Sequence, residues 1–489
     1  MKFYITTPLY YVNAPPHLGH SYTTIAADAL ARFHRRRGDD VYFLTGTDEH
    51  GQKIAQAASL DGLSEKAFTD KMVSVFTRLW KDLEISYDDF IRTTDARHIN
   101  TVKKVLEILY GKGDIYAGAY EGRYCVPCET FWTDLQAEGN LCPDCRRPVE
   151  RVKEENYFFR LSKYQGWLTD YIKAHPDFIK PQSRYNEVLS FLRHNKLDDL
   201  CISRPASRLR WGIELPFAPT HVTYVWFDAL INYISAVGFG SDEEKFKRYW
   251  PADLHLVGKD ILRQHAIYWP IILRAIDVEA PKMIFAHGWW MVGQDKMSKS
   301  RGNALDPAEL AKEYGVDAYR YFLLRDVPFG LDGNFSDEAI VKRKNSDLAN
   351  DLGNLAHRVA TMIDKYFSGA LPDPRNFRPD NLKYDSDNLH KEISADMENV
   401  DFGAALDKIW QLINRANKFI EDTKPWGLLK EKKTEELNSF ILTLVSVIRN
   451  VAEAVACFMP LASKSIQEQY SSSVIKKGLP IFPRLEDAR

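Results

Sequence analysis

The chain has 489 residues, more than one hydrophobic core normally organises, so two or three domains are expected. Hydrophobic residues make up 45% and charged residues 27%, which excludes a disordered chain and fits an ordinary globular protein. The formal net charge of −2 does not decide for or against a nucleic-acid partner, because RNA-binding proteins often concentrate basic residues on one local face.

The N-terminal segment alternates strand and helix. Phe3–Thr6 is a short β-like run, apolar residues recur at helical spacing over Leu18–Arg37, and Val41–Leu44 is a second apolar run. Such a βαβ unit predicts a parallel sheet with helices on its faces. Ligands of these sheets bind beyond the carboxyl ends of the strands. The sequences His17-Leu-Gly-His20 and Asp48-Glu-His-Gly51 are expected at that edge.

The alternation stops near Tyr116–Arg123, a stretch rich in Gly and Tyr, and resumes around Val222. Asp253–Val257 and Met283–Ala286 are the next predicted strands, with a helix running to about Ile276 between them. We therefore expect a Rossmann-like parallel sheet that is split by an insertion of about a hundred residues, a length that suits a subdomain.

Beyond about Asn334 the helical periodicity continues to the end of the chain and predicts an all-α helical bundle. Leu371–Asp387, with its Pro, Asp and Asn residues, is predicted as a loop between two helices. Phe440–Ala462 is strongly apolar, but Arg449 and Glu453 near its middle favour a buried amphipathic helix over a membrane span. The start of the chain lacks the apolar core of a signal peptide, so we expect a cytoplasmic protein without a membrane partner.

The predicted fold class is thus α/β, with a Rossmann-like parallel sheet split by a zinc-bearing insertion and followed by an all-α helical bundle. The expected segments are 1–115 and 222–290 for the two halves of the Rossmann catalytic domain, 116–221 for the connective insertion, 291–335 for a lysine loop and connecting segment, and 336–489 for the helical domain.

The first motif is His17-Leu-Gly-His20, at the point where strand gives way to helix. Gly19 allows a ligand to approach the backbone, and a helix start offers unpaired N–H groups to phosphate. His17 and His20 can then donate to phosphoryl oxygens. A packed helix start would explain the motif equally well if it stood alone.

The second motif is Lys296-Met-Ser-Lys299-Ser, predicted in a polar loop with glycines on both sides. Lysine is a mobile point charge suited to a departing pyrophosphate, and the glycines would allow the loop to close over ATP. A merely solvated lysine loop would not explain why the motif follows a strand of the same sheet.

Four of the six cysteines form two CxxC pairs, Cys125 with Cys128 and Cys142 with Cys145, separated by thirteen residues. Four thiolates satisfy tetrahedral zinc and leave no open position, so a structural Zn²⁺ site is expected. Cys201 and Cys457 are interpreted as small buried residues.

Together these motifs resemble the class I aminoacyl-tRNA synthetases, and more closely the members of that class that charge methionine. The similarity covers essentially the whole chain. Beyond the two motifs it includes Tyr11 and Asn13, Thr45–Gly51, Tyr224–Ala229, Val257–Ile261 with His265, and Lys424–Trp426.

The resemblance implies the residues of a methionine pocket, namely Leu9, Tyr11, Trp226, Ala229, Tyr233, Ile261 and His265, with Asp48 holding the α-ammonium group. It makes Arg204 and Lys259 further active-site candidates, Lys259 for ATP together with His17, Gly19, His20, Lys296 and Lys299. Aromatic and aliphatic walls suit a polarizable thioether. Any one of these aromatic residues alone would be read as core packing.

The resemblance also aligns Asn354, Arg358, Pro425 and Trp426 with residues that read a tRNA anticodon. Asn354 and Arg358 lie four apart, hence on one helix face, and a tryptophan can stack on an unpaired base. The implied partners are ATP with Mg²⁺, L-methionine and tRNA(Met). Because the sequence stops after the helical region, a monomer is expected.

Two departures from the family pattern concern the pocket rim. Pro8 stands where several relatives carry Ala or Ile, and Leu230 stands where several carry Pro. The enzymes for Ile, Val and Leu are rival interpretations, but they hold much larger editing inserts. The cysteine enzyme differs because its zinc lies in the amino-acid pocket. A non-catalytic zinc-bearing RNA-binding protein would need neither motif.

Overall fold

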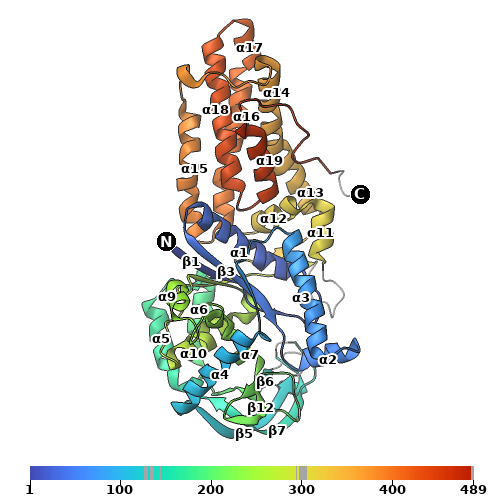
Figure 1. The fold of residues 1–489 in the computed structure, drawn as a ribbon, viewed down its shortest axis with the longest axis vertical. Helices are drawn as coiled ribbons and strands as arrows, with labels where there is room; N and C mark the ends of the chain where they lie inside the picture. Colours follow the sequence, from blue (N-terminus) through green and yellow to red (C-terminus); the bar gives the residue numbers. More distant parts are fainter. Residues whose placement is uncertain (126–129, 133–136, 144, 293–294, 297–304, 486–489) are drawn as a thin grey trace. The chain divides into compact units, whose positions relative to one another are not determined.

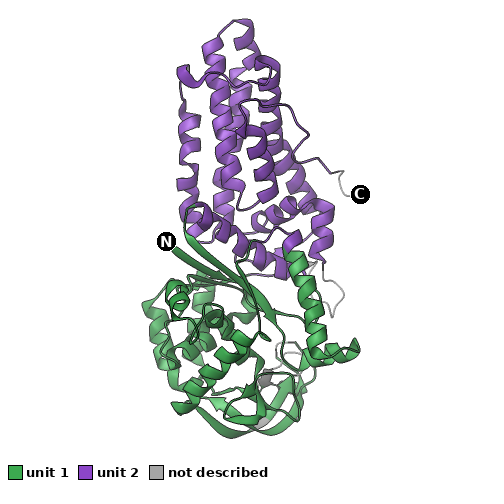
Figure 2. Cartoon of the chain, in the orientation of Figure 1, with its two compact units in different colours: residues 1–16, 37–80, 86–287 green, residues 17–36, 81–85, 288–489 purple. Residues whose placement is uncertain are grey.

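The computed structural model describes residues 1–125, 130–132, 137–143, 145–292, 295–296 and 305–485. The chain divides into two compact units, drawn in green and purple in Figure 2. Unit 1 comprises residues 1–16, 37–80 and 86–287, and unit 2 comprises residues 17–36, 81–85 and 288–489. Each unit is described by itself below.

Unit 1 is built on a seven-stranded sheet with the order β2-β3-β1-β13-β14-β8 and with β4 beside β3. Every pairing in this sheet is parallel, which confirms the predicted fold class. The strands are β1 (Lys2–Thr6), β2 (Tyr10–Tyr11), β3 (Asp40–Asp48), β4 (Asp89–Arg92), β8 (Ile179–Lys180), β13 (Leu254–Gly258) and β14 (Ile284–His287).

The strands β1, β13 and β14 lie within a residue of their predicted positions, because runs buried on both faces must be apolar throughout, whereas β3 extends four residues beyond its predicted end at Leu44. All four residues of β14 are buried, and so are the first four of β13. The two-residue strand β8 comes from within 116–221, so part of the segment expected as an insertion pairs with β14. Helices α5 (Gln165–Ala174) and α6 (Gln182–His194) flank β8 in the sequence.

The rest of the 116–221 segment forms two small antiparallel sheets. One contains β6 (Thr130–Trp132), β5 (Ile115–Cys125), β7 (Glu150–Phe159) and β9 (Leu200–Cys201). The other contains β10 (Ser203–Pro205), β12 (Ala218–Thr223) and β11 (Glu214–Leu215). The Gly- and Tyr-rich stretch that ended the predicted α/β alternation is the long strand β5, which pairs with β7 over ten register positions.

Unit 2 is mainly helical beyond residue 336, as the periodicity predicted (Figure 1). Contacts join α15 with α16 and α18, and α18 with α14 and α19. The helices are α11 (Pro307–Tyr314), α12 (Val316–Arg325), α13 (Asp337–Arg343), the π-helix η6 (Lys344–Gly353), α14 (Asn354–Phe367), α15 (Asn381–Glu398), α16 (Phe402–Thr423), α17 (Pro425–Lys430), α18 (Thr434–Val455) and α19 (Pro460–Ser471).

The loop predicted over Leu371–Asp387 is wrong in its second half, because α15 begins at Asn381. The Asp380 side chain accepts a hydrogen bond from the Lys383 amide and caps the helix. The polar residues that suggested a loop therefore cap α15 and form the exposed face of its first turns.

Among the described residues one helix, α18, is long and apolar enough to cross a membrane by composition alone. Its most apolar window is 61% buried inside the protein, and α18 packs against α14, α15, α16 and α19. A core helix of a bundle passes the same test, so this is weak support for a span. The predicted buried helix over Phe440–Ala462 is in fact interrupted, since α18 ends at Val455 and α19 starts at Pro460.

Helix α1 (Leu18–Arg36) is held within unit 2 by α12. The fully buried Arg320 of α12 donates to Asp28 of α1 at 2.6 Å. The same guanidinium donates to the carbonyl oxygens of Leu83, Cys457 and Phe458. Two turns earlier on α1, the Ser21 hydroxyl lies 2.6 Å from the hydroxyl of Tyr319. These bonds fix the helix on which the first motif begins.

Candidate active site

The first motif begins α1 in unit 2, and its two imidazole rings stack with centroids 3.9 Å apart. The His17 amide donates to His20 Nδ1 at 3.1 Å, and the Gly19 amide donates to His17 Nδ1 at 3.0 Å. Because each Nδ1 accepts, each neutral ring carries its proton on Nε2 and presents Nε2–H as its donor. A Cβ on Gly19 would lie 2.9 Å from the His17 ring, so glycine is needed there.

The second motif falls mostly outside the described residues. Lys296 ends the short strand β16 (Asp295–Lys296), which pairs with β15 (Trp290–Val292), whereas Lys299 lies outside the described part of the chain. The described residues resume at 305, where the Leu305 carbonyl accepts from the Leu18 amide at 3.2 Å. Leu305, five residues beyond the lysine motif, therefore contacts Leu18 of the histidine motif within unit 2.

Three methionine-site candidates of unit 1 lie around β2 and β3, namely Tyr11 and Asp48 at the carboxyl ends of these strands and Leu9 just before β2. Tyr11 pairs with Asp48 in the parallel register, and the Val12 amide donates to the Asp48 carbonyl at 3.3 Å. The Leu9 side chain lies against Gly46, where a Cβ would approach Leu9 Cδ2 to 2.9 Å. The sheet thus brings together a carboxylate, an aromatic ring and an aliphatic side chain.

A second group surrounds His265 on the π-helix η4 (Gln264–Tyr268). His265 Nδ1 lies 2.9 Å from the Ile261 carbonyl, which can only accept, so Nδ1 carries the proton. The Tyr233 hydroxyl then donates to His265 Nε2 at 2.7 Å. Burial lowers the pKa of His265 to about 4, so the ring is neutral at physiological pH. The same burial raises the pKa of Tyr233.

The remaining candidates, Trp226 and Ala229, lie on α7 (Val225–Leu230), which contacts both η4 and α8 (Asn232–Ser235). Tyr233 belongs to α8. Trp226 is half-buried and Ala229 is buried. Unit 1 therefore gathers α7, α8 and η4 into one wall, lined with neutral side chains.

Sequence reasoning missed His255 on β13, which stacks on Tyr233 with ring centroids 4.2 Å apart. Its Nε2 accepts from the Trp269 indole at 3.1 Å, and its Nδ1 lies 2.8 Å from the Thr6 hydroxyl. Burial, with a smaller effect of His265, lowers the pKa of His255 well below its usual value. The only signal in the sequence was a histidine inside an otherwise apolar strand.

Also missed was a network around Asp228, which is fully buried. His50 donates from Nδ1 to one carboxylate oxygen and His98 from Nε2 to the other, each at 2.7 Å. Burial alone would raise the pKa of Asp228, but the two imidazoles lower it overall. His50 and Asp228 both fall within motifs that the sequence analysis quoted, although nothing in the sequence pairs them.

Two further candidates of unit 1 occupy different surroundings. Arg204 is buried on β10, with its guanidinium 4.8 Å from the Tyr224 ring and 5.1 Å from the Tyr124 ring. Lys259 follows the end of β13 and is partly exposed. The structure thus places Lys259 at the same edge of the parallel sheet as Asp48, because both follow or end parallel strands.

Three of the four predicted metal ligands form a cluster. The sulfur atoms of Cys125, Cys142 and Cys145 all lie within 4.8 Å of one another, and those of Cys125 and Cys145 are 3.5 Å apart. Cys128 lies outside the described residues. Three converging thiols, two of them buried, can hold a metal ion.

The anticodon candidates belong to unit 2. Asn354 begins α14 and is exposed, and Arg358 lies one turn further, 3.7 Å from Glu421 of α16. Pro425 is the buried first residue of α17, and Trp426 next to it is 51% exposed. A tryptophan after proline is often a core residue, but here half of its surface faces solvent.

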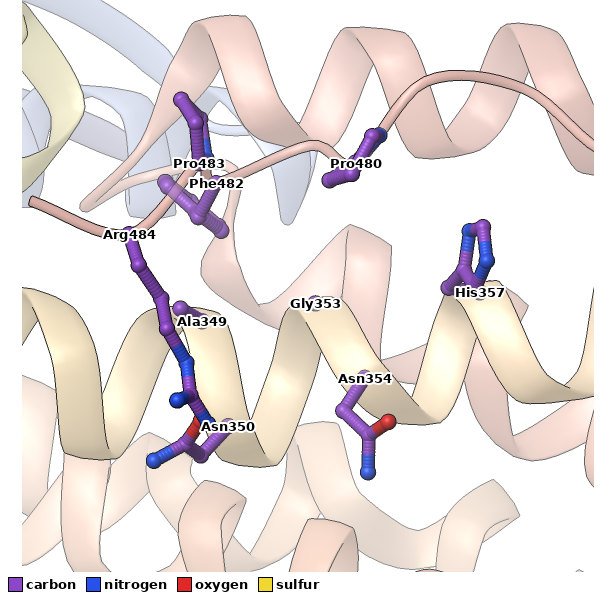
Figure 3. Close-up of a pocket in the computed structure, with 9 residues that line it drawn as sticks. All are labelled: Ala349, Asn350, Gly353, Asn354, His357, Pro480, Phe482, Pro483 and Arg484. Atoms are coloured by element: carbon purple, nitrogen blue, oxygen red, sulfur yellow. The ribbon is translucent and has the colours of Figure 1, made fainter.

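A cavity of about 470 Å³ lies beside Asn354. Figure 3 shows Asn350, Gly353, Asn354 and His357 on successive turns of one helix, with Pro480, Phe482 and Pro483 of the C-terminal segment opposite them. That segment is fixed at its end, where the Leu485 amide and carbonyl both bond to the Asn345 side chain. The cavity is lined by Ala349, Asn350, Gly353, Asn354, His357, Pro480, Phe482, Pro483 and Arg484.

The parallel sheet, the histidine motif at a helix start and the later lysine motif are the combination that defines the class I tRNA synthetases. The family model for tRNA synthetases class I (M) matches residues 3–152 and 147–360. The chain therefore belongs to this family, the methionine members of class I.

Individual relatives agree with the family match. The methionine–tRNA ligase of Caldanaerobacter subterraneus is 51% identical over 99% of this chain and 79% of its own length. The ligase of Thermotoga maritima is 49% identical over 96% of this chain and 75% of its own length. A solved structure of Mycobacterium tuberculosis methionyl-tRNA synthetase with methionyl-adenylate is 42% identical, covers 99% of this chain and all of its own, and has a TM-score of 0.93.

Proposed function

We propose that this chain is a methionine–tRNA ligase. It activates L-methionine with ATP to methionyl-adenylate, releasing pyrophosphate, and transfers the methionyl group to the 3′ end of tRNA(Met). The observation that carries the proposal is the pair of donor imidazoles in unit 2, His17 and His20, in a motif whose Leu18 amide bonds to Leu305, five residues beyond the lysine motif. The predicted methionine-site residues of unit 1 determine which amino acid is bound.

Methionine is selected by a neutral wall and one carboxylate. The side chains of Leu9, Tyr11, Trp226, Ala229, Tyr233, Ile261 and His265 line the thioether, and Asp48 binds the α-ammonium group. A neutral His265, bonded to Tyr233, presents no charge to the sulfur atom. A polarizable thioether gains from aromatic contacts, whereas an amino acid with a charged side chain would lose its hydration without a partner.

In the first step the methionine carboxylate attacks the α-phosphate of ATP in line, the bond to the β-phosphate oxygen breaks, and pyrophosphate leaves. His17 and His20 donate Nε2–H to phosphoryl oxygens, and Gly19 allows the close approach. Lys259, Lys296 and Lys299 add positive charge, and Arg204 is a further active-site residue. Mg²⁺ enters with ATP and neutralises phosphate charge. No covalent enzyme intermediate is needed, because positioning and charge stabilisation lower the barrier.

In the second step a ribose hydroxyl at the 3′ end of tRNA attacks the adenylate carbonyl, and AMP leaves. Asn354 and Arg358, one turn apart on α14, and the exposed Trp426 read the anticodon, with Pro425 fixing the start of α17. Trp426 offers an open ring for stacking on an unpaired base. The cavity beside Asn354 has room for a nucleobase and is bordered by amide and imidazole groups.

The cysteine cluster holds a structural Zn²⁺ through Cys125, Cys128, Cys142 and Cys145. Thiolates that converge from separate turns fit tetrahedral zinc, and four protein ligands leave no position for substrate. Bound zinc would cross-link a small sheet in which, among the described residues, Cys125, Ala137, Cys142 and Val149 form a buried cluster.

The test is amino-acid-dependent exchange of pyrophosphate into ATP, run with methionine, cysteine, leucine and no amino acid. We expect exchange with methionine alone. Exchange with cysteine or leucine instead would contradict the substrate assignment, and no exchange at all would favour a non-catalytic RNA-binding protein. Lys299→Ala should slow adenylate formation far more than it weakens methionine binding, and equal losses in both would contradict the role of Lys299.

A further inference from the structure

Asp228 occupies a position that none of the proposed substrate contacts explains. It is fully buried on α7, between Trp226 and Ala229, and its carboxylate bridges His50 and His98. His50 lies two residues after Asp48, and His98 is in the first turn of α4 (Ala96–Gly111). The carboxylate therefore joins three segments of unit 1 that are far apart in the sequence.

The loop that carries Asp48 is held from one side by Glu49. Arg92 donates to both Glu49 carboxylate oxygens, at 2.6 and 2.8 Å, and Thr94 donates to one of them at 2.7 Å. These bonds tie the loop to the end of β4, but they do not reach α7. The bond between His50 and Asp228 links this segment to α7.

The other end of the network is also fixed. His98 Nδ1 lies 3.2 Å from the Ser235 hydroxyl, and that hydroxyl donates to the Ile231 carbonyl. Ser235 ends α8, the helix that carries Tyr233. Around His50, the Trp211 ring packs edge-on at 5.5 Å, and the Gly51 amide donates to the Trp211 carbonyl. Both imidazoles are thus held in place to meet the carboxylate.

From this geometry we propose that Asp228 is a positioning residue for methionine. It fixes the distance between Asp48, which binds the ammonium group, and the α7 wall formed by Trp226 and Ala229. This inference rests on the proposed function. A buried carboxylate that accepts two short bonds permits little movement, and small displacements of binding groups cost much affinity.

The test compares Asp228→Asn with Asp114→Asn in pyrophosphate exchange. Asparagine keeps the volume but presents an N–H₂ group to one of two donating imidazoles, so one bond is lost. We expect Asp228→Asn to raise KM for methionine about 10- to 100-fold. We expect KM for ATP, and kcat at saturating methionine, to change less than about threefold.

Asp114 is a matched control because it is also buried and accepts two side-chain bonds, from Lys163 and Tyr164, neither of which is a methionine candidate. Asp114→Asn should leave KM for methionine unchanged, even if its melting temperature falls as much as that of Asp228→Asn. An equal rise of KM in both variants would overturn the inference, since general loosening would then be the cause. An unchanged KM in Asp228→Asn would overturn it as well.

A second pair of variants keeps the test decisive if Asp228→Asn folds poorly. His50→Asn places an amide N–H where Nδ1–H stood and should retain most of the affinity, whereas His50→Ala should raise KM for methionine as Asp228→Asn does. Equal KM values for the two His50 variants would contradict the inference. If the unaltered enzyme shows no methionine-dependent exchange, the proposed function itself fails, and that result is distinct from any difference among variants.

Discussion

Two buried aspartates, one in each unit, are neutralised in opposite ways. Asp28 of unit 2 accepts from Arg320 and Arg32, and the rest of the Arg320 fork is bonded to carbonyl oxygens. Asp228 of unit 1 accepts from two histidines. Arginine is a charged planar fork with five N–H donors, whereas each imidazole gives this carboxylate one N–H. The difference indicates an ion-paired joint in unit 2 and a hydrogen-bonded one beside the amino-acid candidates of unit 1.

The largest expected effect tests the buried ion pair between Arg320 and Asp28 in unit 2. Arg320→Met removes a fully buried partner of Asp28, although Arg32 still donates to that carboxylate, and breaking a buried ion pair costs about 3–5 kcal/mol. Urea unfolding followed by circular dichroism should show this loss. The double variant Asp28→Asn/Arg320→Met should lose less than Arg320→Met alone, because the buried group that faced Arg320 then carries no charge. If the free energy of unfolding of Arg320→Met falls by less than about 1 kcal/mol, the ion pair does not hold α1 to α12.

A smaller effect tests His265, a buried titratable group of unit 1. Burial holds the pKa of folded His265 near 4, below its unfolded value of 6.5, so the unfolded chain binds more protons between these values. The free energy of unfolding should therefore fall as pH drops from 6.5 to 4, by about 3 kcal/mol for this group.

His265→Gln removes the titration but keeps an acceptor for the Tyr233 hydroxyl. Urea midpoints at pH 7 and pH 4.5 should differ less in this variant than in the unaltered protein. If the urea midpoint changes with pH in the same way in both proteins, the lowered pKa of His265 is not the cause of the lost stability in acid.

The smallest effect comes from two matched tyrosines. Tyr319 in unit 2 and Tyr233 in unit 1 are both fully buried, and each hydroxyl bonds one side chain. Tyr319→Phe and Tyr233→Phe should each destabilise the protein by about 1 kcal/mol. Only Tyr233→Phe should also change KM for methionine, since it leaves His265 Nε2 without its donor. A change of KM in Tyr319→Phe of equal size would remove the distinction between the two regions.

The sequence predicted the parallel sheet and the helical region because their signals are local. Apolar runs such as Ile284–His287 and the helical spacing of α16 report burial directly. The two-residue strand β8 was missed because two residues carry no period. The boundaries of the five expected segments remain a prediction, and so do the roles of the candidate site residues.

The polar contacts were beyond sequence reasoning for a different reason. His50 and Asp228 are 178 positions apart, and the bond between them depends on how α7 packs. Both residues were quoted within motifs, yet no spacing rule connects a histidine after β3 to an aspartate on a later helix. Of the metal ligands, by contrast, Cys125, Cys142 and Cys145 were found from spacing alone, and their sulfur atoms do converge.

The fork of Arg320 has a consequence for how this sequence can evolve. Three of its four acceptors are main-chain carbonyl oxygens, at Leu83, Cys457 and Phe458, and every residue type supplies such an oxygen. Substitutions at those three positions leave the bonds intact, provided that the backbone keeps its course. Among homologues, packing of the buried side chains should therefore limit residues 83, 457 and 458, not these bonds, while Arg320 and Asp28 change only together. A comparison of substitution patterns would show position 320 covarying with position 28 and with none of the three positions that bind Arg320 through the main chain.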